Sequence, residues 1–505
     1  MGFFSLTPLQ PSRFSAKFSH MGLTVVIAAS EATPFAKTGG LADVAGSLPV
    51  ALKHLGCRVI VFVPYYREVA QRGFEIEETG LNVSVNMGRR TVKAQVLVGA
   101  HHGVPFYFLK RDEYFDRGYL YGTPEGDYFD NLERFTFFSR AVLEVIKARD
   151  LTPDIIHCND WQTGLIPAYL KDIYRAEPVF SRTATVLTVH NIAYQGQFPA
   201  NFYDITGLGS YLFNPEGLEF WGNLNLLKSG IVFSDAITTV SRGYSAEIQT
   251  PEFGYGLEGV LSKRKDDLFG ILNGVDYTEW DPATDTHIPR NYTIDEMKGK
   301  SDCRKKVLKS FGLKVKAKTP VIGMITRLAD QKGIDILSEA MPELMKLDIV
   351  MLILGSGDRR YQELLADLMA HYPDRLSVKI AFNSTLSHLV EAGSDMFLMP
   401  SRYEPCGLNQ IYSLKYGTVP IVRATGGLDD TVKDYSSEGG NGFKFKEYSA
   451  EALVEKVSEA AEVFKNKKAW AEIQRRGMAE DFSWSDAAKK YMDVYKSAQA
   501  RLHKS

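Results

Sequence analysis

The chain has 505 residues, which is more than one hydrophobic core usually supports, so we expect two domains. A formal net charge of −2 provides no summed positive field and argues against a general nucleic-acid binder. No apolar stretch approaches the roughly 20 residues that a membrane span needs, so we expect a soluble chain. Four scattered cysteines without metal-type spacing indicate reduced thiols in a cytosolic protein.

The chain begins with a segment, residues 1–21, that we expect to be extended or disordered. Between Met1 and His20 it contains basic, Ser and Phe residues and no acid, a composition found in organellar targeting segments. It is short and lacks an arginine-rich amphipathic stripe, and Met21 follows it as a second start. We expect a cytoplasmic protein, with a plastid location as the alternative if residues 1–20 act as part of a transit segment.

Short apolar runs alternate with helical patterns in the first half of the sequence. We expect strands at Leu23–Ala29, Arg58–Pro64, Ile155–Cys158, Thr183–Val189 and Ala236–Val240. This alternation is typical of a doubly wound α/β domain. Thr91–Leu109 alternates differently, and we interpret it as an inserted antiparallel pair that decorates this domain.

A second series of strands follows a charged region, Asp285–Lys318, that we interpret as a solvated linker with a helix. The expected strands are Val321–Ile325, Val350–Leu354, Val378–Phe382, Met396–Met399 and Pro420–Val422. The sequence therefore predicts a second α/β domain.

Three basic residues at predicted strand ends indicate an anion site. Arg327 and Lys332 follow the strand at Val321–Ile325, where a forked guanidinium and an ammonium can neutralise a diphosphate. Lys37 stands after the first strand and begins Lys-Thr-Gly-Gly, whose glycines give a permissive backbone. We predict a site for a nucleotide-diphosphate compound between the two halves of the chain.

Further polar and aromatic candidates stand close behind other predicted strands: Asp160, Trp161, His190, Asn191 and Glu404. A lone histidine in such a place is more often packed, and a lone tryptophan is more often core. An acid beside an indole, however, is a common way to grip a sugar, because the indole covers an apolar face and the carboxylate accepts hydroxyl hydrogen bonds. Shared placement at one sheet edge favours a sugar-binding crevice.

Two glycine-bearing loops, Glu404–Gln410 and Thr425–Asp430, expose backbone N–H groups and carboxylates toward the same crevice. One glycine pair alone is more often structural, but two adjacent loops of this kind are a stronger signal. Cys406 has no His or Asn partner near it in sequence, so we interpret it as an inert packed thiol rather than a nucleophile.

Five sequence blocks together carry a family resemblance: Lys37–Val44, Thr188–Asn191, Thr326–Gly333, Pro400–Leu408 and Arg423–Leu428. In this order they resemble the motif set of bacterial-type glycogen synthases and plant starch synthases, and ordered blocks are more specific than any single one. The resemblance runs from about Leu23 to about Tyr495. The Lys-Thr-Gly-Gly form of the first block is closer to the bacterial branch.

The resemblance implies a GT-B fold, in which two Rossmann-like doubly wound domains face a deep cleft. We expect these domains at residues 22–270 and 271–483, with a C-terminal helix at 484–505 that returns to the first. The implied activity is retaining transfer of glucose from ADP-glucose to the non-reducing end of an α-1,4-glucan such as glycogen, starch or maltodextrin.

Roles follow from the resemblance block by block. Donor binding is implied for Lys37, Gly39, Gly40, Asn273, Cys406, Gly407, Leu408 and Thr425. Catalysis is implied for Asp43, His190, Arg327, Lys332 and Glu404. Acceptor binding is implied for Glu31, Asp160 and Trp161. Many related enzymes carry a second glutamate that holds a ribose, but this chain has Tyr412 there, so the ribose contact is unassigned.

The expected chemistry follows from the leaving group. Breaking the anomeric bond builds positive charge on the sugar and negative charge on the diphosphate, which Arg327 and Lys332 would stabilise. No Asp-x-Asp metal motif stands out, so we predict neither a metal nor another cofactor. The sequence does not decide between a covalent intermediate and attack from the face of the leaving group.

Several alternatives stay open. Another GT-B enzyme that uses UDP-glucose, a sucrose synthase type or a phosphorylase would share the architecture. An inactive glucan-binding scaffold would keep the same aromatic and acidic groups, although intact Lys37, Arg327, Lys332 and Glu404 argue against it. We expect a nucleotide sugar and a glucan as partners, with no nucleic acid, and keep a homo-oligomer as an alternative to a monomer.

Overall fold

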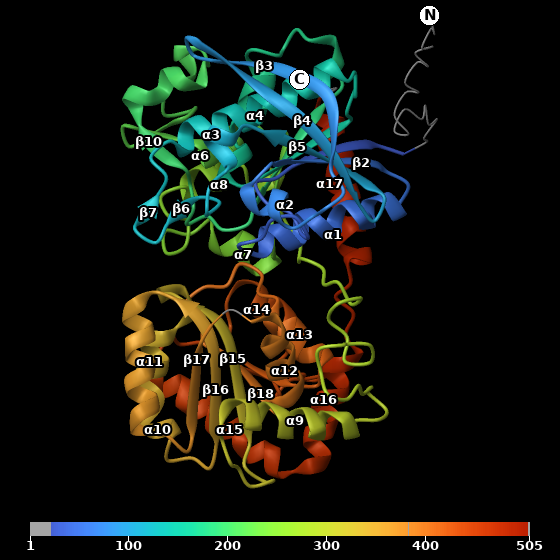
Figure 1. Ribbon diagram of the computed structural model, residues 1–505. Coiled ribbons are helices and arrows are strands. Elements are labelled where there is room, and N and C mark those ends of the chain that lie inside the picture. Colours follow the sequence, from blue (N-terminus) through green and yellow to red (C-terminus); the bar gives the residue numbers. More distant parts are fainter. Residues whose placement is uncertain (1–21, 382, 503–505) are drawn as a thin grey trace, which may run out of the picture.

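The computed structural model describes residues 22–381 and 383–502. In it, two α/β halves lie one above the other (Figure 1). The upper half holds a nine-stranded sheet and the lower half a six-stranded sheet. The segment 1–21, for which we predicted an extended start, lies outside the described residues, as do Phe382 and residues 503–505.

The sheet of the upper half has the order β14-β13-β9-β8-β1-β2-β5-β4-β3. Its strands are β1 (Thr24–Ala28), β2 (Arg58–Pro64), β3 (Glu77–Met87), β4 (Arg90–His101), β5 (Val104–Lys110), β8 (Ile155–Asn159), β9 (Ala184–Val189), β13 (Ala236–Thr239) and β14 (Leu268–Gly270). The five predicted strands pair in parallel and are buried almost throughout. Continuous apolar runs suit such strands because helices cover both faces of a parallel sheet.

The interpretation of Thr91–Leu109 as a decorating pair is wrong in one respect. Strands β4 and β5 do pair antiparallel, but β5 also pairs in parallel with β2, so both belong to the main sheet. The side chains of Phe106 and Phe108 on β5 are fully buried, which gives this strand a core position. Strand β3 was not predicted from the sequence because its mostly exposed residues lack an apolar run.

The lower sheet is parallel throughout and has the order β17-β16-β15-β18-β19-β20. Its strands are β15 (Val321–Leu328), β16 (Val350–Gly357), β17 (Leu376–Ile380), β18 (Met396–Met399), β19 (Val419–Arg423) and β20 (Phe443–Phe445). The main helices of both halves are α1 (Gly40–His54), α4 (Asn131–Ala148), α5 (Leu165–Lys171), α6 (Leu226–Phe233), α9 (Lys298–Phe311), α10 (Ile334–Leu344), α11 (Arg359–His371), α12 (Ser384–Gly393), α13 (Asn409–Lys415), α15 (Ala450–Lys465), α16 (Lys467–Ala479) and α17 (Trp484–Leu502).

The charged region Asp285–Lys318 is not the solvated linker that we predicted. Asp285 is only 4% exposed, and its carboxylate accepts a hydrogen bond from the Tyr416 hydroxyl at 2.6 Å and contacts His388 Nδ1 at 2.9 Å. Helix α9 buries Val307 and Phe311 in the core of the lower half. Asp285 and Lys300 are buried with hydrogen-bond partners, so this part of the region belongs to the core although many of its other charges are exposed.

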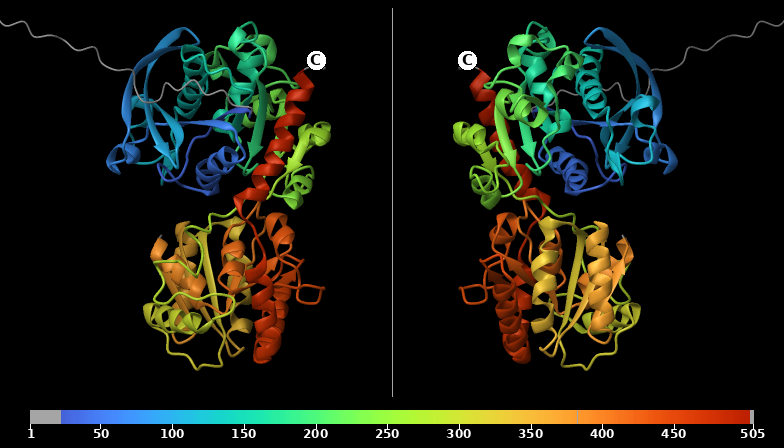
Figure 2. Two further views of the ribbon diagram at one scale, coloured as in Figure 1. Left: turned by 90° about the vertical axis from the view of Figure 1, so that its right-hand side faces the viewer. Right: turned by 90° about the vertical axis from the view of Figure 1, so that its left-hand side faces the viewer.

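The chain crosses between the halves twice, and the two crossings pair with each other. Val275 N–H donates to the Phe482 carbonyl at 2.8 Å, and Val275 and Ser483 form a parallel bridge. Helix α17 then runs along the upper half, where it packs against α1 and β9 (Figures 1 and 2). Its Tyr495 hydroxyl lies 2.9 Å from His157 Nδ1 on β8.

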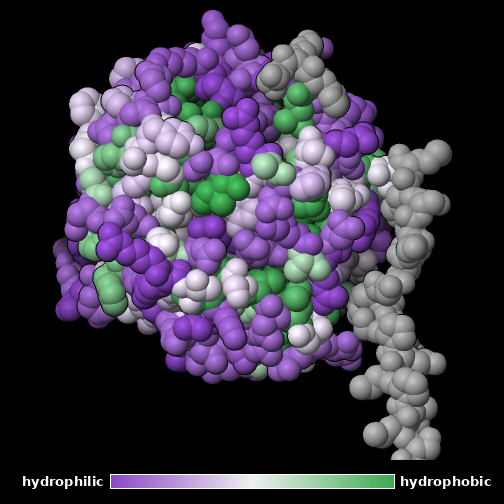
Figure 3. Space-filling model, turned by 90° about the horizontal axis from the view of Figure 1, so that it is seen from above, coloured by the Kyte–Doolittle hydropathy of each residue, from purple (hydrophilic) through white to green (hydrophobic). Residues whose placement is uncertain are grey.

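Seen from above, the surface of the upper half is mainly hydrophilic, and its hydrophobic residues lie in small separate groups (Figure 3). Across residues 22–381 and 383–502, no helix has the length and apolar composition needed to cross a membrane.

Candidate active site

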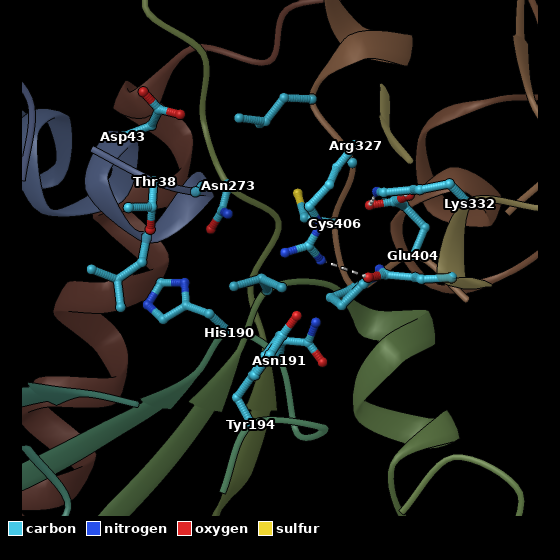
Figure 4. Close-up of a pocket in the computed structure, with 18 of the residues that line it drawn as sticks. Thr38, Asp43, His190, Asn191, Tyr194, Asn273, Arg327, Lys332, Glu404 and Cys406 are labelled. Atoms are coloured by element: carbon cyan, nitrogen blue, oxygen red, sulfur yellow. Dashed lines mark hydrogen bonds and ion pairs between the residues drawn. The ribbon is translucent and has the colours of Figure 1, made fainter. Parts of the chain in front are cut away.

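A cavity of about 580 Å³ lies between the halves and is lined by residues of both (Figure 4). This volume falls within the usual range for small-molecule sites. Its walls contain every site residue predicted from the sequence except Thr425, namely Glu31, Lys37, Gly39, Gly40, Asp43, Asp160, Trp161, His190, Asn273, Arg327, Lys332, Glu404, Cys406, Gly407 and Leu408. The carboxyl ends of both parallel sheets therefore meet at one cavity.

The lower wall holds an ion pair and an adjacent guanidinium. Lys332 Nζ lies 2.9 and 2.7 Å from the two carboxylate oxygens of Glu404, and Ser401 Oγ donates to the same carboxylate at 3.0 Å. Arg327 stands near the end of β15, which runs three residues beyond the predicted strand. The only hydrogen bond of its guanidinium among the described residues is a long one, 3.5 Å to Gln331 Oε1, so the exposed guanidinium is available to an anion.

The upper wall places Lys37 beside the start of helix α1. Lys37 Nζ lies 2.6 Å from Asp43 Oδ1. The N-cap Gly39 provides no side-chain cap, and a Cβ on Gly40 would meet nothing within 4 Å. Gly39, Gly40 and Leu41 line the cavity, so the start of this helix borders it, and the helix dipole there favours an anion.

Glu31 and Asp160 are two buried acidic residues of the upper wall. Glu31 Oε2 accepts hydrogen bonds from the Thr38 N–H and hydroxyl at 2.5 and 2.7 Å, and Asp160 Oδ1 accepts the His190 N–H at 2.7 Å. Burial raises the pKa of each carboxyl group to about 7. Asp160 also has a φ of 55°, a conformation that is sparsely populated and often found at functional sites.

His190 is neutral because burial lowers its pKa to about 3. Its Nε2 lies 2.9 Å from Asn159 Oδ1, while Asn159 Nδ2 donates to the Ala28 carbonyl. This network assigns the proton to Nε2, so Nδ1 remains as a hydrogen-bond acceptor.

Trp161 is 8% exposed and packs edge-on against Phe135 at 4.9 Å between ring centroids. A Cβ on Gly196 would lie 2.4 Å from indole Cε3, so the Gly196 backbone covers part of the ring. The indole is therefore largely a core residue that borders the cavity, and only a small part of it is available for a sugar to stack on.

Two buried acceptors in the lining have no hydrogen-bond partner among the described residues: Asn273 Oδ1 and Gln162 Oε1. An unpaired buried polar atom costs free energy, so each is a natural contact for a ligand hydroxyl. Asn273 was predicted only by resemblance. Gln162 was missed because it carries no motif of its own.

Three further predicted residues, Cys406, Gly407 and Thr425, also have structural roles. Burial raises the pKa of the Cys406 thiol to about 12, which leaves no thiolate for nucleophilic attack. Gly407 has a φ of 70°, which favours glycine. Thr425 lies outside the cavity lining, and its hydroxyl donates to Glu247 Oε1 at 2.8 Å. Among residues 22–381 and 383–502, no group of three acidic, His or Cys side chains is placed to hold a metal ion.

Comparisons with known proteins cover almost the whole chain. Residues 24–263 match the starch synthase catalytic domain, and residues 307–476 match glycosyl transferases group 1. The glycogen synthase of Koribacter versatilis is 48% identical over 477 residues, covering 94% of this chain and 98% of that protein. The chain belongs to the glycogen and starch synthase family. Glycogen synthase 2 of Geobacter sulfurreducens is 46% identical over 478 residues, covering 94% of this chain and 99% of that protein.

Solved structures support the same family. The catalytic domain of starch synthase IV from Arabidopsis thaliana, bound to ADP and acarbose, superposes with a TM-score of 0.88 at 31% identity and covers 95% of this chain and 100% of that one. The sucrose-phosphate synthase of Thermosynechococcus elongatus, at 16% identity and a TM-score of 0.58, shares the fold. The predicted family and GT-B fold are thus confirmed, while the domain limits and the individual residue roles stay predictions.

Proposed function

We propose that this family member is a glycogen synthase, which transfers glucose from ADP-glucose to the non-reducing end of an α-1,4-glucan with retention of the anomeric configuration. The relatives named glycogen synthase, and the related starch synthase bound to ADP and acarbose, support this activity. The observation that carries the proposal is the cavity itself, in which Arg327 and Lys332 face the glycine-rich start of α1.

In this proposal the diphosphate of the donor lies against Arg327, Lys332 and the first N–H groups of α1. These groups stabilise the negative charge that develops as the anomeric bond breaks. The Glu404 carboxylate, held by Lys332 and Ser401, offsets the positive charge of the sugar ring. Lys332 thus contacts the departing diphosphate on one side and, on the other, the Glu404 carboxylate that offsets the positive charge of the sugar ring.

The transferred glucose is held by neutral acceptors and donors. His190 Nδ1 and Asn273 Oδ1 accept hydroxyl hydrogen bonds, while Glu31 and Asp160 stand toward the acceptor glucan. A neutral histidine contributes no charge of its own, so it orients the sugar without opposing the charge on the ring.

The test is an assay of the purified chain with a maltodextrin and either ADP-glucose or UDP-glucose. We expect release of ADP, lengthening of the dextrin and a new α-1,4 linkage by proton NMR. Faster turnover of UDP-glucose would contradict the proposed donor, and no release from either donor would favour the inactive scaffold. A reaction without dextrin measures background hydrolysis.

A further inference from the structure

Two exposed aromatic residues occupy turn positions that disfavour them. Trp221 and Tyr255 have φ of 52° and 51°, and each precedes a glycine, Gly222 at 80° and Gly256 at 84°. Trp221 and Gly222 form the loop between β11 (Glu219–Phe220) and β12 (Asn223–Asn225), since Phe220 pairs with Asn223. The Leu257 N–H closes the second turn on the Gly254 carbonyl at 2.9 Å.

Positive φ at both central residues is the pattern of a type I′ turn, in which Asn-Gly is favoured. A bulky residue at the first position is an outlier that costs conformational free energy. Trp221 is nevertheless 83% exposed and Tyr255 is 46% exposed, so neither aromatic ring is explained by burial in a core.

The two turns lie against each other at the surface of the upper half. A Cβ on Gly256 would lie 2.9 Å from Phe220 Cζ and 3.7 Å from Trp221 Nε1. Glu219 Oε1 accepts the Gly222 N–H at 2.6 Å, which places this carboxylate at the turn that carries Trp221. The two adjacent turns therefore carry an indole, a phenol and a carboxylate.

This pair is continuous with the cavity. The Tyr255 carbonyl accepts a hydrogen bond from Gln195 Nε2 at 3.0 Å, next to Tyr194, which lines the cavity and is 51% exposed. The Tyr255 ring also lies 6.0 Å from the ring of Tyr403, the residue before Glu404. Tyr255 thus borders the mouth of the cavity, and Trp221 lies beyond it.

We propose that Trp221 and Tyr255 form an outer glucan site, on which sugar units of the acceptor stack while its non-reducing end occupies the cavity. The proposal rests on the proposed function. Rigid aromatic faces suit the apolar faces of glucose rings, and the Glu219 carboxylate accepts their hydroxyl hydrogen bonds. The acidic side chains of Glu219 and Glu258 beside the turns disfavour an anionic chain.

The substitution that tests the outer glucan site is Trp221→Asn. Asparagine before Gly222 suits the turn, so the variant removes the indole while the hairpin is maintained or stabilised. We expect the kcat/KM for a long maltodextrin, relative to that for maltotriose, to fall about fivefold, the ratio that corresponds to one lost aromatic contact. Trp221→Tyr should restore most of the ratio because it keeps an aromatic face.

Tyr211→Asn provides a matched control, since Tyr211 is a 66% exposed aromatic of the upper half whose hydroxyl donates to Asp172 instead. In this variant the kcat/KM for long maltodextrin, relative to that for maltotriose, should equal the wild-type value. An unchanged ratio in Trp221→Asn would overturn the outer site and leave the proposed function intact.

Calorimetric titration tests the outer glucan site independently of the proposed function. If the wild type transfers no glucose, the proposed function fails, but the titration of long maltodextrin into wild type and Trp221→Asn still judges the outer site. Weaker binding by the variant supports the site, and equal affinity overturns it.

Discussion

At the residue scale, the cavity holds acidic groups in an unfavourable environment. Glu31 is 3% exposed, and burial raises the pKa of its carboxyl group from 4.5 to about 7, although two hydrogen bonds from Thr38 oppose the shift. Asp160 lies in the same wall and has a similarly raised pKa. Burying ionisable carboxyl groups lowers the stability of the protein, but it provides preformed acceptors for substrate hydroxyls.

The raised pKa of Glu31 predicts how stability varies with pH. Because the folded-state pKa of Glu31 is raised, the stability that it contributes is complete below about pH 4.5 and is lost as pH rises through about 7. We expect the free energy of unfolding of the wild type to fall by roughly 2–3 kcal/mol more than that of Glu31→Gln between about pH 5 and about pH 8. Urea titrations at the two pH values measure the difference.

Glu455→Gln, at an exposed position of α15, is the control and should show the pH dependence of the wild type. Parallel pH curves for wild type and Glu31→Gln would show that the Glu31 carboxyl titrates normally.

The Lys332–Glu404 pair gives a second residue-scale prediction. Lys332→Ala removes a contact that we assign to the departing diphosphate and leaves Glu404 with Ser401 alone. Loss of one charge-assisted contact to the transition state should lower kcat about a hundredfold, or ~3 kcal/mol, with little change in the KM for maltodextrin. Initial rates with ADP-glucose measure both constants.

Lys346→Ala removes a similar charge from an exposed pair with Glu343 in the same half, and its kcat should match the wild type. The assignment of Lys332 would be wrong if its alanine variant kept the wild-type kcat.

At the element scale, two short helices from different halves cap each other. The Asp430 carboxylate accepts the N–H groups of Arg242 and Gly243 at the start of α7 (Arg242–Glu247), at 2.7 and 3.1 Å. Glu247, at the end of α7, accepts the Gly426 N–H and the Thr425 hydroxyl at the start of α14 (Gly426–Thr431), both at 2.8 Å. The halves are therefore joined close to the loop that carries Glu404.

This contact is coupled to the cavity through the backbone. The Gly427 N–H donates to the Glu404 carbonyl at 3.0 Å, and Ser241 Oγ donates to the Pro405 carbonyl at 2.6 Å. The position of α14 against α7 thus helps to fix the backbone that carries the Glu404 carboxylate.

Asp430→Ala should therefore lower activity more than stability. Because Asp430 is exposed, losing its cap should cost no more than about 1 kcal/mol of unfolding free energy. A shift of the Glu404 loop should lower kcat about tenfold, since catalytic groups tolerate little displacement. Urea unfolding and initial rates give the two numbers.

Asp430→Asn keeps a side-chain oxygen that can accept the same N–H groups, and it should retain most of the kcat. If Asp430→Ala and Asp430→Asn had equal kcat, the Asp430 cap would not contribute to catalysis.

The reciprocal caps also show what the sequence could not reveal. Apolar runs such as Arg58–Pro64 predicted buried parallel strands because burial on both faces leaves a continuous signal. Asp430 and Glu247 carry no such signal, since each partner lies in the other half. The resemblance implied donor binding for Thr425, which stays a prediction, and it gave no sign that the same loop contacts the other half through Glu247.

The same limit applies to buried charge. Asp285 belongs to a charged region that resembles a surface linker, and only the folded chain brings His388 and Tyr416 to it. The residues of the cavity could be predicted more completely than these contacts because they follow predicted strands. The carboxyl ends of parallel strands lie at one edge of a sheet, so residues that follow them come close together.

At the scale of the whole molecule, the cations of the site belong to different halves. Lys37 stands in the upper wall, while Arg327 and Lys332 stand in the lower wall. The halves are joined by two paired crossings at Val275 and Ser483 and by the caps of α7 and α14. A diphosphate that contacts both walls therefore favours a closed arrangement over an open one, because it binds the closed arrangement more tightly.

Lys37→Ala tests this bridging directly. The side chain now pairs with Asp43, and the variant removes the charge that the upper wall offers to the nucleotide while the lower wall stays intact. Nucleotide should still bind, but the compaction that ADP induces in small-angle scattering should shrink, and kcat should fall about tenfold with the lost contact. Lys53→Ala removes the same charge at the far end of α1, where Nζ contacts the carbonyls of His102 and Gly103, and should compact as the wild type does. Equal compaction of Lys37→Ala and wild type would refute the bridge even if activity were lost, since Lys37 would then act on the chemistry alone.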